Sequence, residues 1–221
     1  MYAFLVVTGH SLGAGTAVIL AFILRLEYGS LKCVAFGPPG GLLNVTASQL
    51  STDFVTSVVV GDDLVPRLSV NGYLKLLSKM RSTLMACQLP KHKVLATGLC
   101  NCLSPLTWRQ RLRQDPAVSL AIEDEPLDYG TTEHLNCGNW QEMFPPGKII
   151  HIYKTQTDEQ AVSMCFRDPK EFNDILVSAK MINDHAPSSY QKMIYRAKQR
   201  FTTTTAVSSE LSTNQDINPS V

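Results

Sequence analysis

Several features that define other protein classes are missing from this sequence of 221 residues. The longest apolar run, Ala14–Leu24, is well short of the roughly 20 residues that span a bilayer. Met1 is followed at once by strand-like sequence with no basic region, so we expect no secretory signal peptide. Lys and Arg do not cluster, and the formal net charge is +1. Electrostatics therefore give no reason to expect nucleic acid as a partner.

The cysteines lack the paired spacing that builds a zinc site. Six are scattered along the chain, and the single Cys-x-Cys, at Cys100 and Cys102, has no CxxC partner motif. We expect free thiols and no metal ligation by them. Free thiols fit a reducing environment that faces the cytosol.

The composition that is present fits one globular domain with a tail, because 44% of the residues are hydrophobic and 18% are charged. Continuous apolar runs that end at glycine-marked turns alternate with helical or loop crossovers, which is typical of a parallel α/β sheet with its site at the carboxyl ends of the strands. The expected strands are Ala3–Thr8, Leu31–Phe36 and Phe54–Val60, and the expected helices are Leu12–Arg25, buried nearly all round, and Tyr73–Met85.

The second half of the chain is less regular. Gln88–Pro146 has no clear periodicity and predicts a long irregular insert. Lys148–Lys154 predicts a strand, and Ala161–Phe166 can pair with it as a hairpin. Glu171–Phe201 is expected to be mostly helical with a break at "NDHAP", and Thr202–Val221 is expected to be an unstructured polar tail.

The segment Gly9-His10-Ser11-Leu12-Gly13 matches the pattern G-x-S-x-G between an expected strand and an expected helix. In that context the glycines permit a strained turn that exposes the serine hydroxyl as a nucleophile, and side chains in their place would collide with the strand and helix. The backbone N–H of Leu12 would then face a developing oxyanion. The alternative is a glycine-rich bend in which Ser11 only caps the helix.

A nucleophilic serine needs a histidine base and a carboxylate that orients it. Asp62 and Asp63 directly follow the strand "FVTSVVV", at the end of the sheet where Ser11 should lie. We prefer Asp63 because Pro66 and its apolar neighbours should make that loop rigid, and Asp62 is the weaker candidate. The alternative for both is a solvated carboxylate in a turn.

His185 is the expected base. It lies late in the chain, after the last expected strand and on a break before Pro187, which fits the chain order serine, acid, histidine. The other histidines are expected to pack beside the nucleophile (His10), to lie in the insert (His92 and His134) or to be satisfied within a strand (His151).

With these residues placed, the sequence resembles the sn-1-specific diacylglycerol lipases, membrane serine hydrolases whose catalytic domain is related to the class 3 lipases. The resembling segments are "VTGHSLGAGTAVIL", "LKCVAFGPPGGLL", "FVTSVVVGDDLVPRLSV", "GKIIHIYK" and "FNDILVSAKMINDHAP". The resemblance implies an α/β-hydrolase-like parallel sheet in a catalytic domain over residues 1–201, a regulatory or lid-like insert over 88–146 and a disordered tail over 202–221.

The resemblance also implies an activity. It is hydrolysis of diacylglycerol to a 2-monoacylglycerol, such as 2-arachidonoylglycerol, and a fatty acid, with Ser11, Asp63 and His185 as the triad and Leu12 as an oxyanion donor. The substrate would be presented at a membrane surface, on the cytosolic face of the plasma membrane. The chemistry requires no cofactor; calcium is implied by the resemblance alone, and no calcium-binding loop is visible in the sequence.

The family pattern also contains transmembrane helices and strands ahead of the serine turn, together with a second oxyanion donor. None of these is recognisable here, so we expect a C-terminal part of the catalytic domain whose sheet is incomplete on its N-terminal side. Two alternatives stay open: a class 3 triacylglycerol lipase or other esterase, and a non-catalytic fragment.

Overall fold

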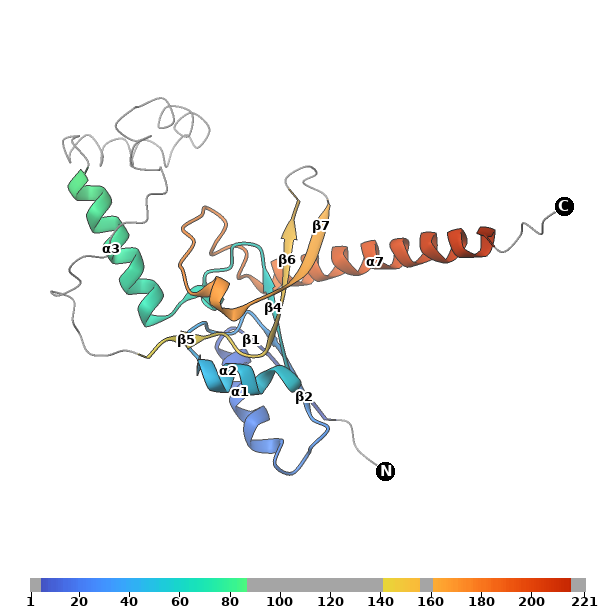
Figure 1. The fold of residues 1–221 in the computed structure, drawn as a ribbon, viewed down its shortest axis with the longest axis horizontal. Coiled ribbons are helices and arrows are strands. Elements are labelled where there is room, and N and C mark those ends of the chain that lie inside the picture. The colour runs from blue at the N-terminus through green and yellow to red at the C-terminus, as the bar shows by residue number, and fades with distance from the viewer. Residues whose placement is uncertain (1–4, 87–140, 156–160, 216–221) are drawn as a thin grey trace. The chain divides into compact units, whose positions relative to one another are not determined.

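The computed structural model describes residues 5–86, 141–155 and 161–215 (Figure 1). They belong to two compact units, residues 1–73 with 140–221 and residues 74–139. Of the second unit, the structure describes the greater part of helix α3 (Val70–Ala86), which begins in the first unit. No helix among the described residues is long and apolar enough to cross a membrane.

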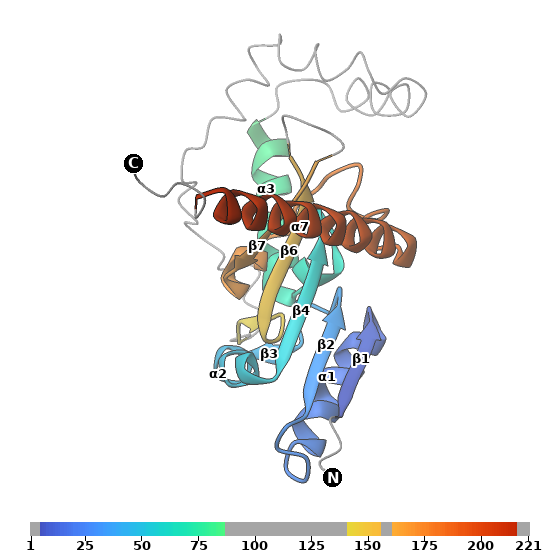
Figure 2. The same cartoon turned by 90° about the vertical axis from the view of Figure 1, so that its right-hand side faces the viewer.

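A mixed five-stranded sheet organises the first unit, with the order β1-β2-β4-β6-β7 in the described residues (Figure 2). The first four strands are parallel, and the last is antiparallel to its neighbour. The strands are β1 (Val6–His10), β2 (Lys32–Phe36), β4 (Val55–Val60), β6 (Lys148–Lys154) and β7 (Val162–Arg167). The expected strands and the expected hairpin of β6 and β7 are confirmed, with β1 shifted about two residues toward Ser11.

The two faces of the sheet are covered by different elements. Cys33 and Ala35 of β2 pack with helix α1 (Leu12–Leu24), whereas the alternate side chains Val34 and Phe36 pack with helix α7 (Pro187–Gln215). Because successive side chains of a strand point to opposite faces, the two helices lie on opposite sides of the sheet. The result is a layered α/β arrangement, as the sequence predicts.

Shorter elements join these layers. Strand β3 (Leu43–Asn44) pairs antiparallel with β5 (Met143–Phe144), so the last residues of the expected irregular insert are ordered. The rest of that insert lies outside the described residues. The remaining short elements are α2 (Val45–Leu50), η1 (Ser51–Asp53), η2 (Val65–Arg67) and η4 (Pro169–Phe172).

Helix α1 corrects one expectation. The sequence predicts that it is buried nearly all round, but only one side packs on the sheet, through small residues such as Ala14 and Ala21. Ile19 and Ile23, one turn apart, are 48% and 60% exposed. Helix α1 is apolar on both sides, but among the described residues its outer side is left largely exposed.

Two further corrections concern the C-terminal part. Residues 173–186 form bends and turns rather than the expected helix, with short-range bonds such as His185 N–H to Ile182 O. Helix α7 in turn continues to Gln215, through most of the expected unstructured tail; residues 216–221 lie outside the described part. Contacts of the turns with the loop that follows β4, described below, outweigh helix propensity in the first case.

Candidate active site

Ser11 occupies a sharp turn between β1 and α1. Its φ of 58° makes it the only residue other than glycine with positive φ in the described part of the chain. Its N–H donates to Phe36 O at 2.9 Å, which ties the turn to the neighbouring strand β2. Its side chain makes no helix-capping hydrogen bond. Ser11 thus occupies the N-cap position of α1, but its side chain does not cap the helix, and its hydroxyl is available to other partners.

The two glycines that flank Ser11 are not equivalent. A Cβ on Gly9 would lie 2.3 Å from Gly13 O, a backbone atom that cannot move aside without distorting α1. A Cβ on Gly13 would meet nothing within 4 Å. The expected collision is thus found at Gly9, and the expectation is wrong for Gly13.

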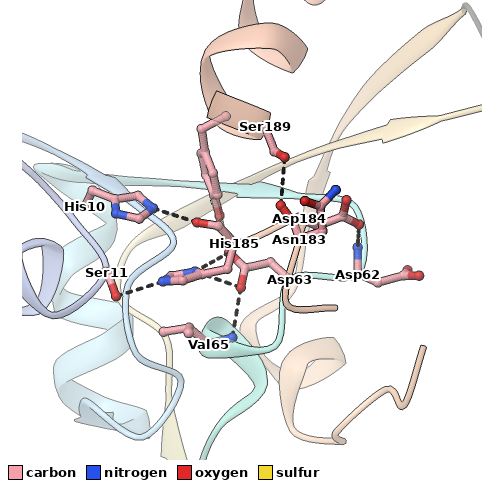
Figure 3. Close-up of polar contacts among 10 residues, drawn as sticks. His10, Ser11, Asp62, Asp63, Val65, Asn183, Asp184, His185 and Ser189 are labelled. Atoms are coloured by element: carbon pink, nitrogen blue, oxygen red, sulfur yellow. Dashed lines mark hydrogen bonds and ion pairs between the residues drawn. The ribbon is translucent and has the colours of Figure 1, made fainter. Parts of the chain in front are cut away.

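Ser11, His185 and Asp63 meet at the carboxyl end of the sheet (Figure 3). His185 Nε2 lies 2.8 Å from Ser11 Oγ, and His185 Nδ1 lies 3.0 Å from both carboxylate oxygens of Asp63. Asp63 is fully buried, whereas the His185 side chain is 21% exposed. A carboxylate at Nδ1 keeps a proton there, so Nε2 is left to accept the serine proton.

Two further donors hold the Asp63 carboxylate. The Val65 N–H donates to Oδ1 at 2.9 Å, and the Tyr190 hydroxyl donates to Oδ2 at 2.5 Å. Burial, together with the charge of Asp63, raises the pKa of Tyr190, so its hydroxyl keeps the proton it donates. Pro66 is buried in the same loop, as its expected rigidity requires. Asp62, the weaker candidate, points away from His185 (Figure 3).

The turns that carry His185 are bonded to the loop that carries Asp63. The Asp62 N–H donates to Asp184 Oδ2 at 2.9 Å, and the Leu64 N–H donates to Met181 O at 3.2 Å. These two bonds fall on either side of Asp63 in the sequence. Burial raises the pKa of Asp184, although the Asp62 N–H opposes that shift.

His10 packs beside the nucleophile, as expected, and it contacts the base directly. Its Nε2–H donates to His185 O at 3.0 Å, because a carbonyl oxygen can only accept. The two imidazole rings are stacked, with centroids 4.8 Å apart and an interplanar angle of 29°. Tyr190 meets the His10 ring edge-on, at 5.4 Å between centroids.

His151 lies in the sheet and away from this cluster. Its Nε2–H donates to Gly61 O at 2.7 Å, and its ring contacts Tyr153 and Phe172. Burial lowers its pKa, which keeps the ring neutral and suited to packing. His151 is thus a satisfied strand histidine, as expected; His92 and His134 lie outside the described residues.

Leu12 stands at the first turn of α1, directly after Ser11. In the described part of the chain, its N–H has no hydrogen-bond acceptor, as expected for the first amides of a helix. An N–H in this position can donate to an oxyanion that forms next to Ser11 Oγ. The Leu12 side chain is 76% exposed, so an apolar surface borders the nucleophile.

Metal and cysteine chemistry find no support at this site. Among the described residues, no three His, Cys, Asp or Glu side chains gather in a way that could hold a metal ion. Cys33 and Cys165 are free thiols, and burial raises the pKa of Cys33 to about 11. The thiol of Cys33 is therefore unreactive at neutral pH.

The mostly parallel sheet with helices on both faces and the serine turn after β1 define an α/β-hydrolase-like fold. Residues 2–73 match the family model of class 3 lipases. The chain is 34% identical to human diacylglycerol lipase-alpha over 192 residues, and 32% identical to mouse diacylglycerol lipase-beta over 212 residues. Each match covers 83% of this chain. The chain is therefore a diacylglycerol lipase-related protein.

The chain spans only part of the relatives that it matches. The matched region is 18% of the length of the human alpha protein and 30% of that of the mouse beta protein. Their names therefore describe proteins much longer than this chain.

Sequence reasoning missed Tyr190 and Asp184, and it placed His10 beside the nucleophile without its bond to His185. Tyr190 binds the acid, Asp184 joins the two loops and His10 holds the base through its carbonyl. A buried aromatic residue in the first turn of the helix that follows His185 was the available signal for Tyr190. Nothing in the sequence indicated which backbone amide Asp184 would accept from.

Proposed function

We propose that this chain carries the catalytic site of a serine lipase that hydrolyses the sn-1 ester of diacylglycerol, releasing a fatty acid and a 2-monoacylglycerol. The observation that carries the proposal is the chain of contacts from Ser11 Oγ through His185 to the buried Asp63. The diacylglycerol lipases among its relatives support the substrate class. The exposed Leu12 beside the nucleophile suits an apolar substrate presented at a lipid surface.

In the proposed mechanism, Ser11 Oγ attacks the ester carbonyl carbon while His185 Nε2 takes the hydroxyl proton. Asp63 stabilises the imidazolium that forms, and the Leu12 N–H donates to the oxyanion. Collapse of the tetrahedral intermediate breaks the ester C–O bond, and His185 returns the proton to the leaving glycerol oxygen. Water, activated by His185, then hydrolyses the acyl-enzyme and frees the fatty acid and Ser11.

A fluorophosphonate probe tests the serine mechanism on the full chain. We expect covalent labelling that maps to Ser11 and disappears in Ser11→Ala. Ser82→Ala is the matched control, because Ser82 is a half-buried serine on helix α3 whose hydroxyl donates to Lys79 O, and the variant should label like the wild type. A chain that takes up no probe would favour the third possibility, a non-catalytic fragment.

The substrate is tested separately with defined lipids. Diacylglycerol, triacylglycerol and a short-chain ester are compared in mixed micelles, and the position of the released chain is read by mass spectrometry. Preference for the sn-1 chain of diacylglycerol is expected. Equal or faster release from triacylglycerol would instead support the second candidate, a general class 3 lipase or esterase, which the family match over residues 2–73 favours.

A further inference from the structure

The base of the proposed triad stands on irregular backbone. His185 belongs to residues 173–186, which form bends and turns rather than a helix or strand. Irregular segments open locally more readily than strands do. The imidazole must nevertheless face Ser11 Oγ, since small errors in the position of a reacting group lower the rate steeply. Something rigid must hold it.

His10 supplies that support from the sheet. It is the last residue of β1, paired in register with Phe36 of β2, and it directly precedes Ser11. Its Nε2–H binds the carbonyl oxygen of His185, and its ring covers one face of the His185 ring. One side chain therefore fixes both the backbone and the ring plane of the base.

We propose that His10 is a positioning residue for the proposed ester hydrolysis, holding His185 against the neighbouring Ser11. This inference rests on the proposed function. Serine and base are then tied to one anchor at the end of β1, so movement of the turns over 173–186 does not separate His185 Nε2 from Ser11 Oγ. Tyr190, edge-on to His10 and bonded to Asp63, joins the acid to the same assembly.

Three substitutions separate the two contacts. His10→Phe keeps a flat ring but removes the N–H donor; His10→Gln keeps an N–H at the reach of Nε2 but removes the ring; His10→Ala removes both. The rate constant of fluorophosphonate labelling should fall roughly tenfold in the first two variants and about 100-fold in His10→Ala. On a short-chain ester, kcat should fall with little change in KM.

The control comes from the same strand. Thr8→Val removes a similar side-chain hydrogen bond, from Thr8 Oγ1 to Val34 O at 2.9 Å, without touching the cluster, and should label at the wild-type rate. Labelling is followed as a rate constant and as an end-point. The end-point counts folded molecules, whereas the rate constant reports the geometry within them, so a variant that folds poorly still gives a result.

The outcomes are distinguishable. If the wild-type chain does not label at Ser11, both the proposed function and this inference are contradicted. If the wild type labels but all three His10 variants keep its rate constant, His10 has no positioning role. The same holds if the variants lose only the end-point of labelling. In both cases the serine mechanism is unaffected. Partial rescue by Phe and Gln relative to Ala supports the positioning role, because a purely structural defect would not follow the two contacts.

Discussion

At the scale of single residues, the two glycines around Ser11 differ in the space available for a side chain. Gly9→Ala should destabilise the chain, because the new Cβ would lie 2.3 Å from Gly13 O. We expect its melting temperature to fall by about 5 °C or more, as measured by circular dichroism.

Gly13→Ala is the matched comparison. Gly13 is helical and has open space at its Cβ position, so alanine should leave the melting temperature unchanged or raise it through better helix propensity. A loss in Gly13→Ala as large as that in Gly9→Ala would contradict the asymmetry.

Tyr190 provides a second test at this scale. Tyr190→Phe removes the hydroxyl that donates to Asp63 Oδ2 and leaves the Val65 N–H in place. Since a hydrogen bond to a buried charge is worth roughly 1.5–3 kcal/mol, the rate of ester hydrolysis should fall by about 10-fold or more. Steady-state kinetics measure the effect.

Tyr195→Phe is the control for that loss. Tyr195 lies on the same helix and is 62% exposed, so it should behave like the wild type. Equal rates in Tyr190→Phe and the wild type would mean that the hydroxyl does not support the acid.

The sequence was sufficient to bring Ser11, Asp63 and His185 together as candidates, because each follows a recognisable pattern: a glycine turn, the end of an apolar strand, and a loop late in the chain. The residues that support them were not predictable in the same way. Tyr190 reaches Asp63 across 127 positions of sequence, and Asp184 reaches the Asp62 amide across 122. Such contacts depend on how the loops fold back, which local patterns do not encode.

At the scale of elements, the contact of Asp184 with the Asp62 amide predicts how the stability of the chain depends on pH. Burial raises the pKa of Asp184 above its ordinary value of 3.8, so folding disfavours its charged form. Stability is then lost as the pH rises from that ordinary value through the raised one. Asp184→Asn keeps an oxygen acceptor for the Asp62 N–H and has no charge to bury.

Melting curves of both proteins from about pH 4 to about pH 8 check this. The variant should match the wild type at the acidic end and gain relative stability as the pH rises. A variant that becomes less stable than the wild type at neutral pH would show that the charge itself strengthens the contact.

The elements also show where local reasoning works. Strands β2, β4 and β6 are short segments rich in Val, Ile and other apolar residues, and their pattern alone located them. The turns over 173–186 carry residues that favour helix, but the Asp62 and Leu64 amides bind Asp184 and Met181 there. Tertiary contacts therefore determine the conformation of residues 173–186. The continuation of α7 to Gln215 could not be predicted either, because the polar composition of that segment is typical of an unstructured tail.

At the scale of the whole chain, the outer side of α1 predicts self-association. Ile19 and Ile23 are exposed on it, and β1 pairs only with β2 among the described residues. Exposed apolar surface next to an unpaired strand edge favours contacts between copies. Light scattering after gel filtration should show concentration-dependent oligomers that Ile19→Lys with Ile23→Lys reduces.

Tyr195→Lys is the control, since it places the same charge at an exposed position of α7. It should leave the oligomers unchanged. A monomer at all concentrations in the wild type would show that these surfaces do not associate.

The contact between His185 and Ser11 spans 174 positions of the chain, and the contact between His185 and Asp63 spans 122. Such pairs close the longest loops and form only after most of the intervening chain has collapsed. During refolding, reactivity toward a serine probe should therefore appear later than helical signal. Labelling of Ser11 then requires that β1 and the turns before α7 are already in contact. The time course of labelling therefore reports when this long-range contact forms during refolding.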